Sequence, residues 1–320
     1  MLSSRYYDFE DIPEEVLSKI DFLLVGVCKE ERTRKIPTSL KDKLAGRIIT
    51  IEYDIETEKY ILTRSDDMII DRTEGISEIG TDLIPNFIDE LKKLEIDNCS
   101  VLIESTSMVH PMLFYALKVF KEEFNLDQLF VTYTEPHKYK QNDEAVTVRR
   151  FDLTEKFCNR SSLPGFLRIS RQDNDKTLVA IMGFEGNRFS KTYEEVNPSA
   201  YSTYAIVGLP SYQPNWQYYV YSQNKEVLEQ SKAYLKLDRV TAYDPFGIYN
   251  SLQRIMDNIG SNELIVAPLG TKPHSIGSCM FAIDNPDVQL HYDYPFLGKK
   301  IRTEGVGKSY LYNLTGYIND

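Results

Sequence analysis

Short apolar runs alternate with segments of helical spacing along most of this chain, and this alternation restricts the fold more than any other feature. Asp21–Val27, Ser100–Ser105, Thr177–Phe184 and Glu263–Ala267 are such runs, and a loop and a helical pattern follow each of them. Uninterrupted apolar runs of this length are typical of strands that are buried on both faces. Because strands that alternate with helices favour a parallel arrangement, the sequence predicts an α/β fold with mostly parallel sheets.

The two halves of the chain resemble each other in the order of their elements. Leu23–Lys35 resembles Val179–Lys191, since both contain an apolar run, a glycine, an acidic loop and an Arg-x-x-Lys pair. Ser100–Leu117 resembles Glu263–Ile283, since both contain a strand, a Ser/Thr loop and a histidine near the start of an apolar helix. A repeat in fixed order indicates an internal duplication. We therefore expect two Rossmann-like halves, with a chance match of α/β segments as the alternative.

The alternation also sets the expected boundaries within the chain. They are 1–20 for an N-terminal arm, 21–140 for the first Rossmann-like half, 141–175 for a linker, 176–298 for the second half and 299–320 for a C-terminal tail. Three local features are predicted: a helix over Ile76–Leu94 that Pro85 kinks or breaks, a strand over Arg239–Tyr243, and a helix after Asp244 as its N-cap. The weakly alternating tail suits additional strands at a sheet edge.

Composition restricts the class of protein. The net charge of −11 argues against a large nucleic-acid surface, although it leaves room for a small pocket with local Lys and Arg. No apolar run approaches the roughly 20 residues that span a bilayer, and the acidic, polar N-terminus does not resemble a signal peptide. We therefore expect a cytoplasmic protein. The four cysteines are widely spaced and the four histidines scattered, so we expect reduced thiols and no metal site.

The segment Asn262–Ala282 contains the strongest candidate for a binding site. A predicted strand ends at Ala267, and Gly270, Thr271 and Lys272 occupy the turn into the next helix. Backbone amides at a helix N-terminus, the helix dipole, a hydroxyl and an ammonium group together suit an anion. The turn is therefore predicted to bind a phosphate-bearing ligand, with a surface lysine on a tight turn as the alternative.

Other residues could join this site or form a second one. His274, at the start of the same helix, is a candidate ligand contact and the candidate catalytic acid or base, or else a capping or packed histidine. Arg188 and Lys191 follow the first strand of the second half, and parallel strands bring such loops to one sheet edge. The corresponding residues of the first half are weaker candidates: Arg32, Lys35, Ser105 and Thr106. A solvated, charged loop is the alternative for the Arg/Lys pairs.

Several well-known catalytic and cofactor motifs are absent from the sequence. The spacing of a P-loop is missing, no Gly-x-Gly-x-x-Gly follows the first strand of either half, and no Gly-x-Ser-x-Gly occurs. A dinucleotide cofactor is therefore not expected, and no other cofactor is predicted.

The segment LIVAPLGTKPHSIG resembles the ligand loop of CARF (CRISPR-associated Rossmann-fold) proteins, in which a strand leads into a Gly-Thr-Lys turn and an apolar helix. The resemblance covers this motif and, more loosely, the alternation of strands and helices. It implies that Thr271, Lys272 and Arg188 contact the ligand and that the ligand is a cyclic oligonucleotide. The first half departs from the pattern because its loop has no lysine. No effector domain is expected after the second half, which leaves either a ligand sensor without an obvious output or a subunit whose output belongs to a protein partner.

Three functions are compatible with these observations. The first is a ligand-binding sensor or subunit in a prokaryotic anti-phage defence system. The second is a nucleotide phosphodiesterase or nuclease that uses His274 and Lys272. The third is a non-catalytic assembly subunit of a larger complex.

Overall fold

The computed structural model divides the chain into two compact units. The first unit comprises Arg5–Tyr139 and Ile301–Asp320, and the second comprises Lys140–Lys300 together with Met1–Ser4. The described residues are 6–12, 14–44, 47–54, 59–65, 83–140, 154, 156–157, 163, 165–168, 175–260, 262–296 and 301–319.

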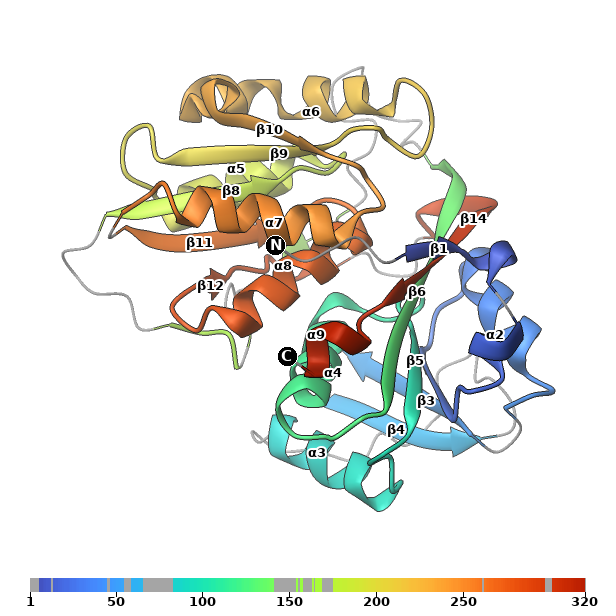
Figure 1. The fold of residues 1–320 in the computed structure, drawn as a ribbon. Helices are drawn as coiled ribbons and strands as arrows, with labels where there is room; N and C mark the ends of the chain where they lie inside the picture. Colours follow the sequence, from blue (N-terminus) through green and yellow to red (C-terminus); the bar gives the residue numbers. More distant parts are fainter. Residues whose placement is uncertain are drawn as a thin grey trace. The chain divides into compact units, whose positions relative to one another are not determined.

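The second unit contains a five-stranded sheet of order β10-β9-β8-β11-β12 in which all neighbouring strands are parallel (Figure 1). Its strands are β8 (Lys176–Ile181), β9 (Thr203–Gly208), β10 (Leu237–Val240), β11 (Glu263–Pro268) and β12 (Gln289–Leu290). Numbered within the unit, the order is 3-2-1-4-5, which is that of a Rossmann-like sheet. The order reverses between β8 and β11, so the loops after these two strands lie at the switch point.

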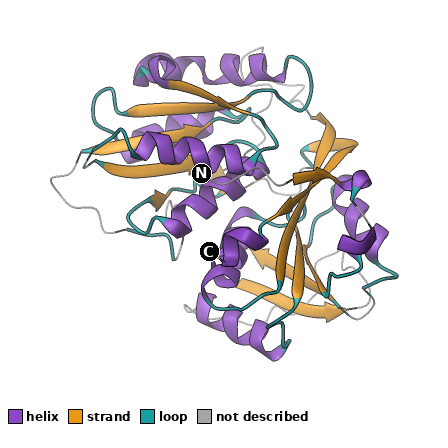
Figure 2. Ribbon diagram, in the orientation of Figure 1, coloured by secondary structure: helices purple, strands orange, loops and turns teal. Residues whose placement is uncertain are grey.

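Helices cover both faces of this sheet (Figure 2). They are α5 (Gly186–Val196), α6 (Trp216–Ser231), α7 (Pro245–Met256) and α8 (Lys272–Asp284), with a short 3-10 helix, η3 (Ala233–Lys236), after α6. Helix α5 packs with α6, and α7 packs with α8. A separate two-stranded sheet joins β7 (Lys156–Phe157) to β13 (Pro295–Phe296). Every side chain of α8 from Pro273 to Ile283 is buried, which explains why this helix is apolar on all sides.

The first unit contains a seven-stranded sheet of order β1-β14-β6-β5-β2-β3-β4. Its strands are β1 (Tyr6–Asp8), β2 (Phe22–Gly26), β3 (Ile48–Asp54), β4 (Lys59–Ser65), β5 (Ser100–Glu104), β6 (Gln128–Tyr139) and β14 (Thr303–Asn313). The four central strands, β6, β5, β2 and β3, are parallel, and antiparallel strands extend the sheet at both edges. The predicted C-terminal tail thus supplies β14, which pairs with β6 and closes the first unit.

The helices of the first unit are short except for two. They are η1 (Phe9–Asp11), α1 (Glu14–Leu17), η2 (Glu31–Arg34), α2 (Lys35–Leu40), α3 (Leu83–Lys93), α4 (His110–Glu122) and α9 (Thr315–Asn319). Phe9, Ile12, Ile36 and Leu40 pack with sheet residues such as Leu23 in one apolar cluster. Because β2 is buried over its whole length, it forms the centre of the sheet, as its uninterrupted apolar sequence predicts.

One local prediction is corrected by the structure. The strand expected over Arg239–Tyr243 lies earlier, because β10 ends at Val240 and the following residues turn toward α7. The predicted helix Ile76–Leu94 is described from Leu83 to Lys93 as α3, and its first part, 76–82, lies outside the described residues. Asp244 is confirmed as the N-cap of α7, with its carboxylate 3.0 Å from the Gly247 amide.

Among the helices that the structure describes, none combines the length and the apolar character that crossing a membrane requires.

Candidate functional site

The loops after β8 and β11 meet at the switch point of the second unit. A Cβ added to Gly183 would lie 2.3 Å from the carbonyl oxygen of Leu269, and one added to Gly270 would lie 2.9 Å from that of Met182. Both distances are too short for any side chain, so the two loops pack backbone against backbone. Gly270 is therefore required by this packing. The contact fixes the position at which the chain enters α8.

The turn into α8 is held by the side chain of Thr271. Its hydroxyl donates to the Ala242 carbonyl at 2.6 Å and accepts from the His274 amide, with 3.4 Å between the two atoms. Gly270, Thr271 and Lys272 are all half-buried, so ligands can reach the turn from solvent. Within the described residues, neither the Gly270 nor the Thr271 amide donates to a protein acceptor. The helix that follows has 13 residues, which is long enough for a full dipole at its N-terminus.

His274 is fully buried beneath this turn. Its Nε2 lies 2.9 Å from the Thr241 carbonyl oxygen, and burial lowers the pKa of the imidazole to about 4. The ring is therefore neutral at pH 7, with the Nε2 proton donated to the carbonyl. Among the described residues, none hydrogen-bonds to Nδ1. His274 thus connects the segment after β10 to α8 from inside the fold.

The low pKa of His274 makes stability depend on pH in a definite direction. The pKa of His274 in the folded state lies below the ordinary value of 6.5. Neutral His274 therefore contributes to the unfolding free energy in full above pH 6.5, and this contribution is lost as the pH falls toward 4. We expect the unfolding free energy of the wild type to decrease by roughly 3 kcal/mol more than that of His274→Gln between pH 7 and pH 4. Urea unfolding of both proteins across this range measures the difference. If the unfolding free energies of the two proteins fell equally with pH, the lowered pKa of His274 would be contradicted.

Arg188 is directed away from solvent and forms a buried ion pair. Its Nε and one terminal nitrogen lie 2.7 and 2.6 Å from the two carboxylate oxygens of Asp293, and its guanidinium lies 5.9 Å from the centre of the Tyr292 ring. Asp293 and Tyr292 follow β12, whereas Thr271 and His274 contact the segment after β10. The predicted ligand residues of the second unit therefore fall into two groups with different neighbours.

The remaining residues around α5 are also bound within the protein. Lys191 pairs with Glu195 at 3.3 Å and lies 4.2 Å from the centre of the Phe157 ring. Glu185, the residue before α5, accepts hydrogen bonds from the amide and the hydroxyl of Thr154, both at 2.9 Å. Residues from the predicted linker thus contact the loop and helix that follow β8.

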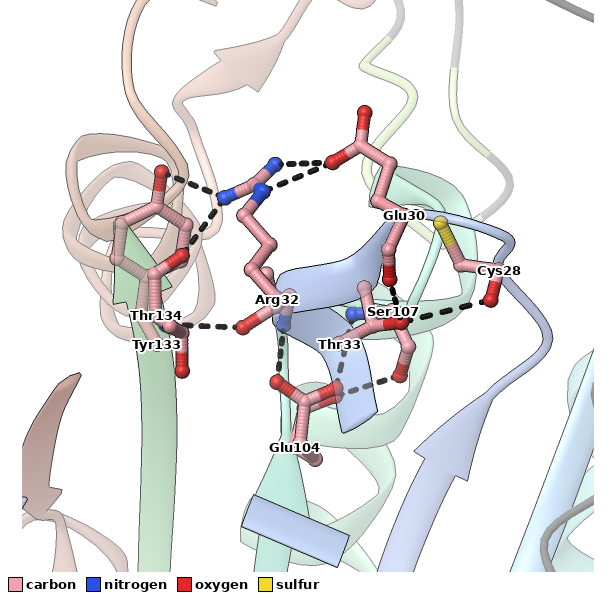
Figure 3. Close-up of polar contacts among 9 residues, drawn as sticks. Cys28, Glu30, Arg32, Thr33, Glu104, Ser107, Tyr133 and Thr134 are labelled. Carbon is pink, nitrogen blue, oxygen red and sulfur yellow. Dashed lines mark hydrogen bonds and ion pairs between the residues drawn. The ribbon is translucent and has the colours of Figure 1, made fainter. Parts of the chain in front are cut away.

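The first unit places its arginine in a similar setting (Figure 3). Arg32 is buried, and its guanidinium binds the Glu30 carboxylate through two nitrogens at 2.8 and 2.7 Å. A third nitrogen donates to the Tyr133 hydroxyl at 3.2 Å and to the Thr134 carbonyl at 2.7 Å. The guanidinium also lies 5.5 Å from the centre of the Tyr133 ring. Arg32 therefore joins the segment after β2 to β6, much as Arg188 joins α5 to the segment after β12.

The loop after β5 differs from the loop after β11 in one important respect. The buried carboxylate of Glu104 accepts from the Thr106 amide at 3.0 Å and from the Ser107 amide at 2.9 Å. Glu104 and Ser107 are drawn in Figure 3. The hydroxyl of Ser107 accepts from the Gly26 amide, and that of Thr106 accepts from the Thr134 amide. The amides that an external anion would need are thus occupied by a carboxylate of the protein itself.

The other two weak candidates have structural partners. The Ser105 hydroxyl donates to the Thr132 carbonyl at 2.7 Å. Lys35 forms an ion pair with Glu10 at 2.5 Å. Sequence reasoning did not identify Asp293 or the role of Glu104, because their partners come from packing between strands. An acidic residue at the end of a strand, followed by a Ser/Thr turn, was the one available signal for Glu104.

The described residues include no group of three or more His, Cys, Asp or Glu side chains that could bind a metal ion. No protein-family model matches the chain, and a comparison with curated proteins also finds no match. The candidate site must therefore be interpreted from its own chemistry. In the turn Gly270–Lys272, half-buried residues lie beside the Gly270 and Thr271 amides, which have no acceptor among the described residues.

Proposed function

We propose that the second unit binds a phosphate-bearing ligand at the turn Gly270–Lys272. The observation that carries this proposal is the contrast with the first unit. There, the loop at the same place in the sheet holds the Glu104 carboxylate on its amides. In the second unit the strand before the turn ends in Ala267 and Pro268, so no carboxylate at that position competes for the Gly270 and Thr271 amides.

Electrostatics favour a phosphate group at this turn. The N-terminus of α8 carries a partial positive charge, and the Lys272 ammonium adds a full one. Because the turn is half-buried, its charges are less screened than those on an open surface. The switch point of a parallel α/β sheet is also where such folds bind their ligands.

The wider role that we propose is that of a ligand-binding sensor or subunit resembling CARF proteins. A protein of this kind responds to a nucleotide-type signal and passes the response to a protein partner. The resemblance of LIVAPLGTKPHSIG to the CARF ligand loop supports this role, and a place in prokaryotic anti-phage defence follows from the same resemblance. A non-catalytic assembly subunit of a larger complex is the alternative, and it predicts co-purification with a partner but no ligand binding.

We also propose that the two units arose by internal duplication. Strands β3-β2-β5-β6 and β9-β8-β11-β12 follow the same order, and a 13-residue helix follows both β5 and β11. A Cβ added to Gly26 would lie 2.5 Å from the Ser107 carbonyl, which parallels the contact of Gly183 with Leu269. In both units a buried arginine also contacts a tyrosine and the residue directly after it. Four shared features in one order support a common origin.

Replacing Lys272 tests the binding site. We expect the wild type to bind inorganic pyrophosphate in isothermal titration calorimetry, and Lys272→Ala to bind it about tenfold or more weakly, because a charge-assisted contact is lost. Lys225→Ala, on the exposed face of α6, is the matched control and should bind like the wild type. Equal affinities of Lys272→Ala and the wild type would show that pyrophosphate binds elsewhere. If the folded wild type did not bind pyrophosphate, the proposed phosphate site would be refuted.

Turnover assays of the wild type and of two alanine variants distinguish a sensor from an enzyme. A sensor binds without turnover, whereas a phosphodiesterase that uses His274 and Lys272 would release product, and both Lys272→Ala and His274→Ala would abolish this release. The burial of His274 and its contact with the Thr241 carbonyl favour the sensor. Chromatography of nucleotide and cyclic-oligonucleotide substrates after incubation with the protein decides between the two.

A further inference from the structure

We propose that exposed residues at the amino edge of β9 and β10 form a docking surface for an acidic segment of a partner protein. This docking surface consists of Tyr201, which precedes β9, and of Lys232, Tyr234, Leu235 and Lys236, which lead from α6 into β10 (Figure 1). Because β9 and β10 are parallel, the segments before them lie at the same edge of the sheet. The turn into α8 lies at the opposite edge, so this inference does not depend on the proposed phosphate site.

Lys236 joins the two parts of the docking surface. Its ammonium group donates to the Tyr201 carbonyl at 2.7 Å and lies 4.5 Å from the centre of the Tyr204 ring. Lys236 directly follows Tyr234 and Leu235 in the chain. The exposed side chains before β9 and those before β10 are therefore neighbours.

Three large side chains of the docking surface are exposed to solvent. Tyr201 is 65% exposed, Leu235 64% and Tyr234 50%. Within the described part of the chain, the hydroxyl groups of the two tyrosines have no hydrogen-bond partner. Tyrosine contributes strongly to binding at protein interfaces, because it combines a large apolar ring with a hydroxyl group. Exposed apolar side chains that lie together, rather than singly, indicate an interaction site.

The backbone holds two residues of the docking surface in an unfavourable conformation. The φ angle is 60° at Tyr201 and 58° at Lys232, and residues with a side chain rarely adopt a positive φ. The Ser202 amide donates to the Ser199 carbonyl at 3.0 Å, which closes the turn around Tyr201. The Leu178 amide donates to the Ser202 carbonyl at 2.9 Å, which attaches this turn to β8. A strained, exposed tyrosine on a fixed turn indicates a binding role, since its conformation costs stability.

Charge identifies the kind of partner. Neither lysine of the docking surface forms an ion pair with a residue that the structure describes. The acidic residues closest to them in the sequence have other partners. Glu229 pairs with Lys225 at 3.9 Å, and Asp238 pairs with Arg254 at 3.0 Å. The docking surface is therefore locally positive on a chain with a net charge of −11, and charge complementarity favours an acidic partner.

Two other occupants fit the docking surface less well. In a two-fold interface between two copies of this chain, the lysines of both copies would face each other. An anionic membrane is recognised by clusters of about four to eight Lys or Arg residues, and the docking surface contains only Lys232 and Lys236. A protein segment with Asp or Glu beside an apolar residue matches both the lysines and the exposed rings.

The test is selection of random linear peptides, displayed on phage, against the full chain. We expect enriched peptides to contain Asp or Glu beside an apolar residue. In fluorescence polarisation, these peptides should bind Tyr201→Gly and Leu235→Ser about tenfold or more weakly than the wild type. Tyr218→Ser is the matched control and should bind like the wild type, because Tyr218 is 63% exposed but lies at the other end of α6.

Thermal unfolding distinguishes a binding role of Tyr201 from a structural one. Glycine adopts a positive φ without strain, so Tyr201→Gly should melt at the temperature of the wild type or above it. The same variant should bind the enriched peptides more weakly. If Tyr201→Gly lost stability and kept its peptide affinity, the tyrosine would have a structural role and the docking surface would be refuted.

The double variant Tyr201→Gly/Leu235→Ser decides which partner occupies the docking surface. The acidic partner is refuted if the wild type enriches no peptide relative to the double variant, or if the enriched peptides lack acidic residues. A wild-type dimer that dissociates in the double variant, measured by sedimentation, would show that a second copy binds there instead. Binding to phosphatidylserine vesicles that the double variant loses would show that the docking surface contacts a membrane.

Discussion

Arg188→Ala is expected to lower the unfolding free energy by about 3–5 kcal/mol, because it leaves the Asp293 carboxylate buried without a counter-charge. The carboxylate is fully buried, and both of its oxygens are bonded to the guanidinium. Water cannot replace the lost partner at such a position without opening the structure. The cost therefore reflects the uncompensated charge of Asp293 more than the strength of the ion pair itself.

Chemical denaturation of the wild type and the variant measures this effect. Lys191→Ala, one turn further along α5, is the matched control because its charge is partly exposed and pairs with Glu195. Exposed pairs contribute about 1 kcal/mol or less, so this variant should remain close to the wild type. Removing both partners in Arg188→Met/Asp293→Leu should recover much of the lost stability. Equal stabilities of Arg188→Ala and Lys191→Ala would show that the ion pair is not buried in solution.

This pair also shows why Arg188 was difficult to interpret from the sequence. Its position after an apolar strand predicts correctly that it lies near the carboxyl edge of a parallel sheet. Its partner, however, lies 105 residues away, after the last strand of the unit. An arginine that is free to contact a ligand and one that closes the fold have the same local sequence, and only the strand order brings Asp293 to it.

The elements that the sequence predicted well are those with local physical causes. The strand Phe22–Gly26 follows from an uninterrupted apolar run, and the start of α7 follows from Asp244 and the proline after it. The end of β10 was predicted less well, because Val240 and the residues after it have similar strand propensity. That strand stops where Leu209 and Pro210 supply backbone partners for Val240 and Ala242, a tertiary cause that no local pattern records.

The two turns into α4 and α8 illustrate the same limit at the site. Their sequences indicate hydroxyl-rich loops before apolar helices, and the missing lysine already distinguished the first unit. That Glu104 folds back onto its own loop depends on burial of the carboxylate beside β6, which the sequence does not reveal. The geometry therefore changes the interpretation of the first unit from a weaker ligand site to a loop with a built-in anion.

Glu104→Ala is expected to lower the unfolding free energy by about 2–6 kcal/mol, since the buried Thr106 and Ser107 amides each lose their acceptor at a cost of about 1–3 kcal/mol. If these amides form an anion site like that proposed for the second unit, phosphate should bind in place of the carboxylate. We therefore expect phosphate to raise the melting temperature of Glu104→Ala more than that of the wild type.

Glu104→Gln is the matched control for this prediction, because it keeps the side-chain volume and one acceptor oxygen but replaces the other with a donor. It should be destabilised less than Glu104→Ala and should gain no additional response to phosphate, since its amide still fills the loop. Differential scanning calorimetry in matched phosphate and chloride buffers measures both effects. If phosphate changed the melting temperatures of the three proteins equally, the loop amides of the first unit would not constitute an anion site. The comparison between the loops after β5 and β11 would then no longer support binding at Gly270–Lys272.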